Sequence, residues 1–388
     1  LIWTVLALAA NNPGAVIEQT GSTGMEFLGG YALGRAYIRS RADFAAMTRV
    51  LVLMVIVMLP FAVFETLTSR SLWLEFLRMI PGVKTLWEIP SEARSLFGMK
   101  LERVQGGFAH PIHFGLFCSV CFSLCVVGMK GIFSTPRRQL SGAALALAAC
   151  LSLSSGALLA VALQGALILW ALALAKVPGR WWVLVGLFVL IYIGIDLASE
   201  RTPIRVFMSY ATFSAHNAFW RGIIFEWGMK SVWAHPILGI GLNDWVRPSF
   251  MVGSSVDNFW LLTAMRYGIP AFACLVAGYV WVLVALMRRD FHSDAVLTQF
   301  RLAWVFTFLG LSFTLCTVHV WGAMYSFTFF ILGAGVWMMH ALPEDGTGPA
   351  EEVTPARRET LFARSFETET PDAPSDTARY SRFMKDRS

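Results

Sequence analysis

The sequence predicts an all-α polytopic membrane protein, and three observations support this fold class. Of the 388 residues, 56% are hydrophobic and only 14% are charged, whereas soluble domains hold about 45–50% apolar and about 25% charged residues. Several uncharged runs are long enough for the ~20 residues that a helix needs to cross a bilayer. The 15 Trp residues suit the membrane–water interface, where indole is enriched. These properties exclude a soluble globular enzyme, a disordered protein and a fibrous repeat.

Uncharged runs place the individual membrane spans. Four of them predict one span each: 50–64, 111–129, 181–195 and 267–287. Residues 139–175 and 302–342 are far too long for one crossing of ~20 residues. Each is therefore expected to form two helices, with turns near 152–156 and 319–322. The sequence thus predicts at least eight transmembrane helices, and residues 27–34 are a weaker further candidate.

The membrane domain is predicted to cover residues 1–342. Its first apolar run, residues 1–10, lacks the preceding basic residues of a complete signal peptide, which indicates that earlier spans are missing. The last 46 residues, 343–388, hold 7 Lys/Arg against 10 Asp/Glu, a net charge of −3, whereas the rest of the chain carries +9. This tail is rich in Pro, Thr, Glu and Asp, so it is predicted to be disordered.

The distribution of Lys and Arg predicts the orientation in the membrane. Cytoplasmic loops carry the excess of these residues, and one set of loops holds nearly all of them: Arg35, Arg39, Arg41, Arg49, Lys130, Arg137, Arg138, Lys176, Arg180, Arg288 and Arg289. The short loops on the other side, at Ser154 and His319, hold none. The basic loops and the tail are therefore predicted to be cytoplasmic. Two long segments, about 66–110 and 198–258, then lie outside.

Polar residues concentrate in these two outer segments. The pattern from Phe213 to Trp233 predicts an interfacial helix, on which Asn217 and Arg221 share a face because they are four residues apart. The basic membrane body suits anionic lipid or an anionic substrate. Nucleic acid is not an expected partner, because no basic run is interleaved with aromatic residues outside the spans.

Some residues with chemical potential favour structural roles. Cys118 and Cys121 lie inside a predicted span without further ligands, so they are expected to be packing residues. Gly30 and Gly34 are expected to allow close helix packing. Gly239-Ile-Gly241 is expected to be a turn, since it lacks the strand–helix setting of a nucleotide-binding loop. His110 and His113 are three apart at a helix entrance, where a structural role is favoured over metal binding.

A set of motifs in the outer segments is specific in combination. Arg221 is followed by His235-Pro-Ile-Leu-Gly-Ile-Gly, then by Asp257-Asn-Phe-Trp-Leu and by Arg266-Tyr-Gly-Ile-Pro. Supporting features are Arg103 in the sequence RVQGGFAHP and the turn LSLSSGALLAV. With these features the sequence resembles the O-antigen ligase and O-antigen polymerase family of bacterial membrane glycosyltransferases.

The resemblance implies a polyprenyl-diphosphate-linked glycan as donor. It implies transfer to a hydroxyl of a glycan or lipid A core at the periplasmic face of the bacterial inner membrane, with no metal and no cofactor. The sequence departs from the family pattern at two places. The family often has His-Asn where Asp257-Asn258 stands, and an Arg commonly sits in the turn where Ser154 and Ser155 stand.

The chemistry of such a transfer agrees with the residues present. No ATP is available outside the inner membrane, so the donor must be pre-activated, and the charge of its diphosphate must be held by a metal or by cations. The chain has no Asp-x-Asp pair and no clear metal-ligand cluster. Arginine is then the natural clamp, because its planar fork makes paired hydrogen bonds to phosphate. The outward-side candidates are Arg103, Arg205, Arg221 and Arg266.

A sugar hydroxyl also needs a general base, and two residues are candidates, His235 and Asp257. Clustered arginines would lower the pKa of Asp257, so it would orient the acceptor while His235 accepts the proton. Asn217 and Asn258 would support the site. Structural roles stay open: His235 can start a turn, Asp257-Asn258 can cap the next helix, and an arginine can contact a lipid headgroup.

Two other classes of function compete with transfer. A lipid-linked glycan flippase or another polysaccharide transporter would carry charged residues along a path inside its spans, and the predicted spans lack such residues at their centres. A purely structural scaffold gives no reason for the Arg- and His-bearing outer segment. Within the enzyme class, ligation, polymerisation and exopolysaccharide polymerisation are all compatible with the sequence.

Overall fold

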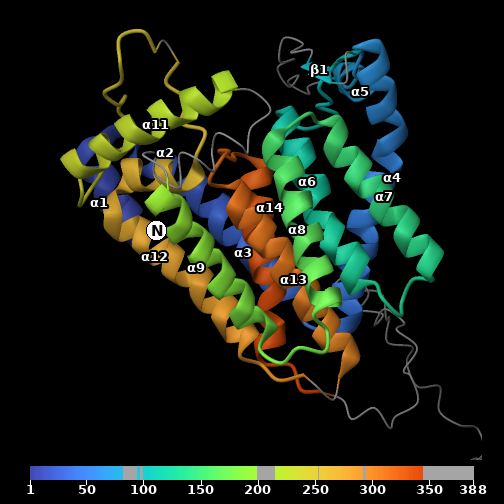
Figure 1. Cartoon of the computed structure of the whole chain (residues 1–388). Coiled ribbons are helices and arrows are strands. Elements are labelled where there is room, and N and C mark those ends of the chain that lie inside the picture. Colours follow the sequence, from blue (N-terminus) through green and yellow to red (C-terminus); the bar gives the residue numbers. More distant parts are fainter. Residues whose placement is uncertain (82–93, 97–98, 199–214, 252, 292–293, 344–388) are drawn as a thin grey trace, which may run out of the picture. The chain divides into compact units, whose positions relative to one another are not determined.

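The computed structural model describes residues 1–81, 94–96, 99–198, 215–251, 253–291 and 294–343 (Figure 1). Within these ranges the regular secondary structure is helical, apart from two short paired strands. The strands β1 (Arg94–Leu96) and β2 (Met99–Leu101) are antiparallel, and Ser95 is paired with Lys100. The predicted all-α fold class is confirmed. The predicted disordered tail, residues 343–388, lies outside the described part of the chain beyond Pro343.

Among the described residues, six helices are long and apolar enough to cross a membrane: α4 (Arg41–Thr68), α6 with η3 (Pro111–Gly128), α8 (Ser155–Ala173), α9 (Arg180–Ala198), α12 (Phe259–Met287) and α13 (Ala295–Thr314). The chain is therefore a membrane protein with several spanning helices. The remaining two predicted spans form the shorter helices α7 (Thr135–Leu151) and α14 (Ala323–Gly335), the latter extended by η4 (Val336–Met339). The count of eight spans stays a prediction.

The other helical segments lie N-terminal to the spans or in the outer segments. They are α1 (Ile2–Asn11), η1 (Pro13–Ala15), α2 (Val16–Gly24), η2 (Met25–Gly29), α3 (Gly30–Tyr37), α5 (Leu72–Arg78) and α11 (Ala215–Ala234). The weaker predicted span, 27–34, forms parts of η2 and α3 and packs along α14. A Cβ at Gly30 or Gly34 would collide with the backbone of Ser326 or Phe330. The expected close packing through Gly30 and Gly34 is confirmed.

The core lies around α6 and α13, whose side chains are mostly buried. Cys118 and Cys121 are fully buried in this core, which confirms their expected packing role. Gln164 of α8 is buried among these helices and is satisfied there, because its Nε2 donates to the Ser119 carbonyl (2.9 Å) and its Oε1 accepts from the Ser123 amide (3.1 Å). The Gln164 amide therefore links α8 to α6, and both its nitrogen and its oxygen have hydrogen-bond partners although it is buried.

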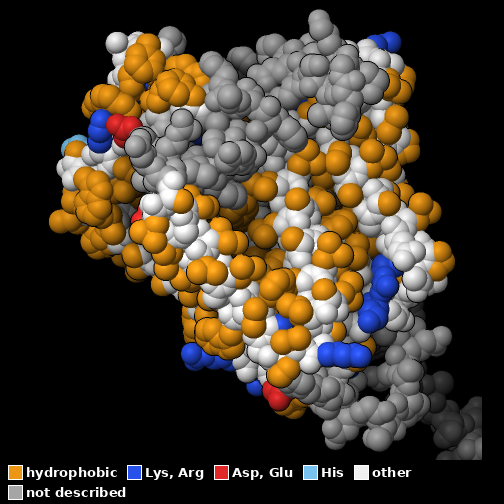
Figure 2. Space-filling model, viewed as in Figure 1, with side chains coloured by type: hydrophobic (Ala, Val, Ile, Leu, Met, Phe, Trp, Pro, Cys, Tyr) orange, Lys and Arg blue, Asp and Glu red, His pale blue; other side chains and the backbone are white. Residues whose placement is uncertain are grey.

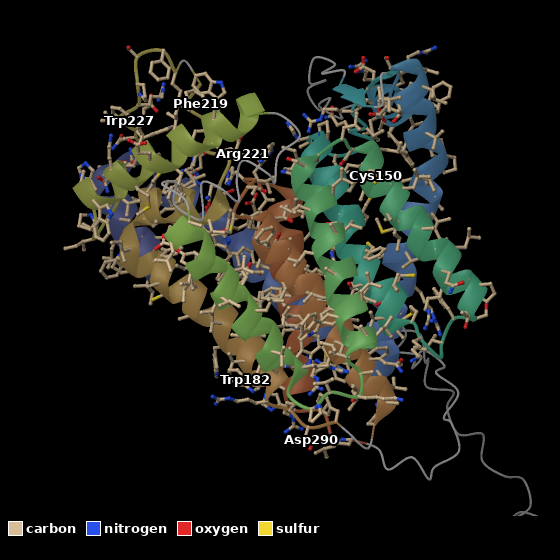
Figure 3. The ribbon with its side chains drawn as sticks, in the orientation of Figure 1. Cys150, Trp182, Phe219, Arg221, Trp227 and Asp290 are labelled. Carbon is tan, nitrogen blue, oxygen red and sulfur yellow. The ribbon has the colours of Figure 1, made fainter. Side chains whose placement is uncertain are left out.

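The two ends of the helices differ in charge. In Figure 3, Arg221 and Cys150 lie at one end, and Trp182 and Asp290 lie at the other. The basic loops are at the Asp290 end, where Arg41 pairs with Asp294, and Figure 2 shows Lys and Arg side chains toward this end, with hydrophobic side chains over the flanks of the visible helices. The visible Lys and Arg side chains gather toward the Asp290 end, although some lie at the Arg221 end too, and the described parts of the two outer segments share the Arg221 end.

Candidate functional site

A small pocket at the Arg221 end brings together three of the residues expected in a site. It is lined by Arg221, Ile224, Phe225, Asp257, Asn258, Leu261 and Cys316. Its cavity volume is about 10 Å³, which is about the size that holds one water molecule, so the pocket is a shallow, partly open depression between these side chains. Three segments meet there: α11, the start of α12, and the turn that follows α13.

Helix α11 positions Arg221 over the start of α12. The predicted helix, 213–233, is confirmed over Ala215–Ala234, and in Figure 1 it crosses the end of α12 at a steep angle. Its inner face carries the buried Ile224, which packs with Leu261 of α12. A Cβ at Gly228 would come within 2.7 Å of the Leu261 side chain, so this glycine allows the close crossing. The side chain of Asn217 lies outside the described part, so its predicted role stays a prediction.

Asp257 and Asn258 have different roles at the start of α12. The Asn258 Oδ1 accepts from the Leu261 amide (2.9 Å), so Asn258 is the residue that caps the helix. The Phe259 amide donates to the carbonyls of Leu315 and Val318 (2.9 and 3.1 Å), which fixes this helix end against the turn after α13. Asp257 makes no part of the cap, and its side chain lines the pocket with Arg221.

The electrostatics of Asp257 differ from the expectation. The Asp257 side chain is exposed to solvent, yet the protein packed around it raises the pKa of the carboxyl above its ordinary value, and Arg221 opposes this rise. The predicted lowering of this pKa was wrong in direction, because desolvation outweighs the positive charge. A carboxylate with a raised pKa is a stronger base, and it remains accessible to an acceptor.

Helix α12 is broken at Gly268, about two turns beyond Leu261 of the pocket. Gly268 has φ 79° and ψ 172°, and Pro270 has no amide hydrogen. The carbonyls of Met265 and Arg266 therefore lose the partners that a continuous helix would give them.

The loop after α11 supplies new partners for these carbonyls. The amides of Ile240 and Gly241 donate to Met265 O and Arg266 O (2.8 and 2.9 Å). In return, the Ile269 amide donates to the Pro236 carbonyl (2.8 Å). Gly239 and Gly241 both have φ 65°, so the expected turn is confirmed. The motifs HPILGIG and RYGIP are thus the two sides of one backbone junction.

The end of α1 holds the same loop from the other side. The Asn12 Oδ1 accepts from the Leu242 amide (2.7 Å), and its Nδ2 donates to Asn243 Oδ1 (3.0 Å). The Asn11 Nδ2 donates to the Gly239 carbonyl (3.2 Å). Sequence reasoning missed this pair, although Asn-Asn before Pro13 at the end of an apolar run is a turn signal.

Arg266 belongs to the junction and not to the pocket. It lies nine residues beyond Asp257, which corresponds to roughly 14 Å along a helix. Its charge acts on His319 and Tyr325, and it hydrogen-bonds to Tyr267. Burial and the Arg266 charge lower the pKa of His319 to about 4, so this imidazole is neutral at neutral pH.

Arg103 lies at the Arg221 end of the molecule, at a different place from the pocket. Its Nε donates to the Ser152 carbonyl (3.3 Å), and the Val104 amide donates to the Leu151 carbonyl (3.1 Å). Arg103 therefore rests on the Ser152–Ser154 turn. The next residues of its loop are held by Glu65 of α4, whose carboxylate accepts from the amides of Gln105 and Gly106 (2.7 to 3.2 Å).

The remaining candidates are not brought to the pocket. His235 is exposed at the end of α11, about 20 Å along the helix from Arg221, and it is absent from the pocket lining. His110 caps α6, because its Nδ1 accepts from the Ile112 amide (3.0 Å). Arg205 lies outside the described residues. Within the described residues, no group of three or more His, Cys, Asp or Glu could hold a metal ion.

The comparisons with known proteins agree with the family resemblance that the motifs indicate. Residues 140–276 match a family model described as O-antigen ligase. No curated protein and no solved structure matches the chain. The matched segment runs from α7 into α12 and contains Arg221, His235, Asp257 and Arg266. Over this segment, about a third of the chain, the match confirms the similarity to the O-antigen ligase and polymerase family.

Proposed function

We propose that the chain transfers glycan from a polyprenyl-diphosphate-linked donor to a sugar hydroxyl, as an O-antigen ligase or polymerase in lipopolysaccharide or exopolysaccharide biosynthesis. The observation that carries the proposal is the convergence of Arg221 and Asp257 in one pocket, where the charge of Arg221 acts on the carboxylate. Transfer requires a cation for the leaving diphosphate and a base for the acceptor. The pocket holds one residue of each kind side by side.

In this mechanism Asp257 accepts the proton of the acceptor hydroxyl. The hydroxyl oxygen then attacks the anomeric carbon of the donor, and the bond from that carbon to the diphosphate oxygen breaks. The electron pair leaves on the diphosphate, which Arg221 holds through paired hydrogen bonds. A preorganised donor of this kind contributes roughly 3 kcal/mol to transition-state stabilisation. The raised pKa of Asp257 favours this division of roles over one in which Asp257 only orients the acceptor.

The other arginines are assigned supporting parts. Arg103 rests on the Ser152–Ser154 turn and supplies a cation where the family commonly carries one in the turn itself. Arg266 would act on the donor from the α12 junction. Asn258 holds the start of α12, and Asn217 shares the Arg221 face of α11. His235 remains the alternative base, although it is exposed outside the pocket. Charge neutralisation by arginine, without a metal, is part of the proposal.

The proposed setting is the bacterial inner membrane, with at least eight spans. The pocket and the segments 66–110 and 198–258 would be periplasmic, and the basic end and the tail would be cytoplasmic. The support is the concentration of Lys and Arg at the end that carries Asp290. Cysteine labelling of intact spheroplasts with an impermeant reagent tests it. We expect labelling at the exposed position 246 and not at position 137, and the reverse pattern contradicts the periplasmic site.

Reconstitution in proteoliposomes tests the activity itself. We expect the full chain, supplied with a synthetic polyprenyl-diphosphate oligosaccharide and a lipid A core or oligosaccharide acceptor, to form a longer product and release polyprenyl diphosphate. Lipid A core as the required acceptor identifies a ligase, and a repeat-unit acceptor identifies a polymerase. Movement of the donor between leaflets without a new glycosidic bond contradicts transfer and indicates a flippase.

A further inference from the structure

An exposed tryptophan surrounded by histidines lies in the turn between α13 and α14. Trp321 is 43% exposed, and its ring centroid is 4.1 Å from that of His113, 5.8 Å from that of His319 and 6.0 Å from that of His110. The histidines come from two segments, the start of α6 and the turn itself. Their convergence on one indole is therefore a product of the fold, and the proposed transfer assigns no role to it.

Two of the histidines around Trp321, His113 and His319, each have a buried nitrogen without a hydrogen-bond partner in the described part of the chain. His113 is 1% exposed, and the two nitrogens are its Nε2 and the Nδ1 of His319. Buried polar atoms without a partner are rare, and each asks for an explanation such as a bound ligand or water. The neutral imidazole of His319 offers one donor and one acceptor, which suits a hydroxyl group.

The cluster borders the proposed catalytic pocket. Cys316, from the same turn, lines the pocket, and the Val318 carbonyl accepts from the Phe259 amide directly after Asp257-Asn258. Trp321 follows Cys316 by five residues, so the two lie no more than about 17 Å apart even if the chain between them is extended. A ligand in the pocket that extends by a few groups therefore reaches Trp321.

We propose that Trp321, His110, His113 and His319 form a subsite that binds one pyranose ring of a glycan substrate. This inference rests on the proposed function. The C–H face of a pyranose would stack on the indole, whose face carries negative potential. Its hydroxyl groups would hydrogen-bond to imidazole nitrogens beside the indole. Either the acceptor or the donor glycan presents this chemistry.

Direct binding tests the subsite without any transfer. The probes are the methyl pyranosides of glucose, galactose, mannose and N-acetylglucosamine, observed by saturation-transfer NMR on the full chain in nanodiscs. We expect at least one to bind, Trp321→Ala to weaken it about tenfold, and Trp321→Phe to weaken it less because an aromatic face remains. Trp233→Ala is the matched control, since Trp233 is 67% exposed on α11, and it should bind as the wild type does.

Two results overturn the subsite. One is the absence of binding by every pyranoside, and the other is equal binding by the wild type and Trp321→Ala. If Trp321→Ala and Trp233→Ala lose binding equally, Trp321 is only an interfacial anchor, which also overturns it. Binding of inorganic pyrophosphate, measured on the same variants, should depend on Arg221 and not on Trp321. If pyrophosphate binding does not depend on Arg221 while the pyranosides still bind, the proposed function is contradicted and the subsite is not.

With a working transfer assay, the Trp321→Ala variant also identifies the bound glycan. A KM that rises about tenfold for the acceptor alone places the acceptor ring on Trp321, and the same rise for the donor alone places the donor ring there. The kcat should change little in either case, because Trp321 binds a part of the substrate that does not react.

Discussion

Two regions at the same end of the molecule carry the motifs of the family, and the structure uses them differently. In the pocket, Arg221 and Asp257 present charged side chains to a common space. In the α12 junction, the loop 236–241 and the break at Gly268 meet through backbone amides and carbonyls. In our proposal the first region acts on a ligand, whereas the hydrogen bonds of the second hold the break in α12.

The difference shows that motif residues divide into chemical and architectural ones. Gly239 and Gly268 are required because the backbones of the two segments touch. A Cβ at either position would collide with the backbone of the facing segment. The junction fixes Arg266 relative to the loop after α11, because the Gly241 amide donates to the Arg266 carbonyl. Substitutions in the pocket should therefore reduce turnover with stability unchanged, and substitutions in the junction should reduce stability first.

The largest effect on turnover is expected for Asp257→Asn. The change keeps the shape and removes the base, so kcat should fall about 10²–10⁴-fold, while the melting temperature stays unchanged because Asn258 caps α12. Asp257→His should retain some activity, since imidazole accepts a proton near neutral pH. The control is Asp244→Asn, which neutralises an exposed carboxylate of the same outer segment outside the pocket. Full activity of Asp257→Asn would transfer the role of base to His235.

Loss of the clamp is expected to have the next largest effect. Arg221→Ala should lower kcat/KM about 100-fold, in line with roughly 3 kcal/mol for one preorganised donor. Arg221→Lys should also be impaired, because it keeps the charge and loses the paired fork. The matched control is Arg247→Ala, which removes an arginine of the same outer segment that pairs with Asp244 (2.5 Å). Near-normal kinetics of both Arg221 variants at matched expression would refute the clamp.

The junction should respond in the opposite way. Gly268→Ala forces a side chain into a backbone conformation that is nearly exclusive to glycine, at about 1–3 kcal/mol, and against the Ile237 carbonyl. We expect a lower melting temperature in detergent, with the activity of the folded fraction reduced less than in Asp257→Asn. Gly278→Ala, in the same helix, meets no neighbour within 4 Å and should be neutral. Unchanged stability of Gly268→Ala would show that the junction is not structural.

The smallest effect is expected at the end of α1. Asn12→Ala removes the acceptor of the Leu242 amide and should cost about 1 kcal/mol of unfolding free energy. Asn12→Asp keeps an acceptor at that position and should restore most of the stability. Thermal unfolding of the two variants measures the difference. If Asn12→Asp is as destabilised as Asn12→Ala, the hydrogen bond to Leu242 is not what holds the loop.

The sequence predicted the fold class and the helix α11 because hydrophobic and polar patterning act locally. It also predicted the glycine contacts of α3, since residues four apart share a helix face. It could not predict that Asn258 is the cap and Asp257 the pocket residue, because adjacent residues differ only by the direction of their side chains. The direction of the Asp257 pKa shift depends on the protein packed around the carboxyl. The approach of His113 to Trp321 joins residues 208 positions apart, and no local pattern encodes it.

The central claim is that Asp257 is the base and that Arg221 acts on it within one pocket, and the pH dependence of kcat/KM tests this most directly. Activity should fall as the pH drops through the pKa of Asp257, because protonation removes the base. Arg221 opposes the rise of this pKa, so Arg221→Ala should move the acidic limb to higher pH, and Arg221→Lys should move it less. Asp257→His should place the limb near the ordinary histidine pKa of about 6.5. An acidic limb at the same pH in the wild type, Arg221→Ala and Asp257→His would contradict the account.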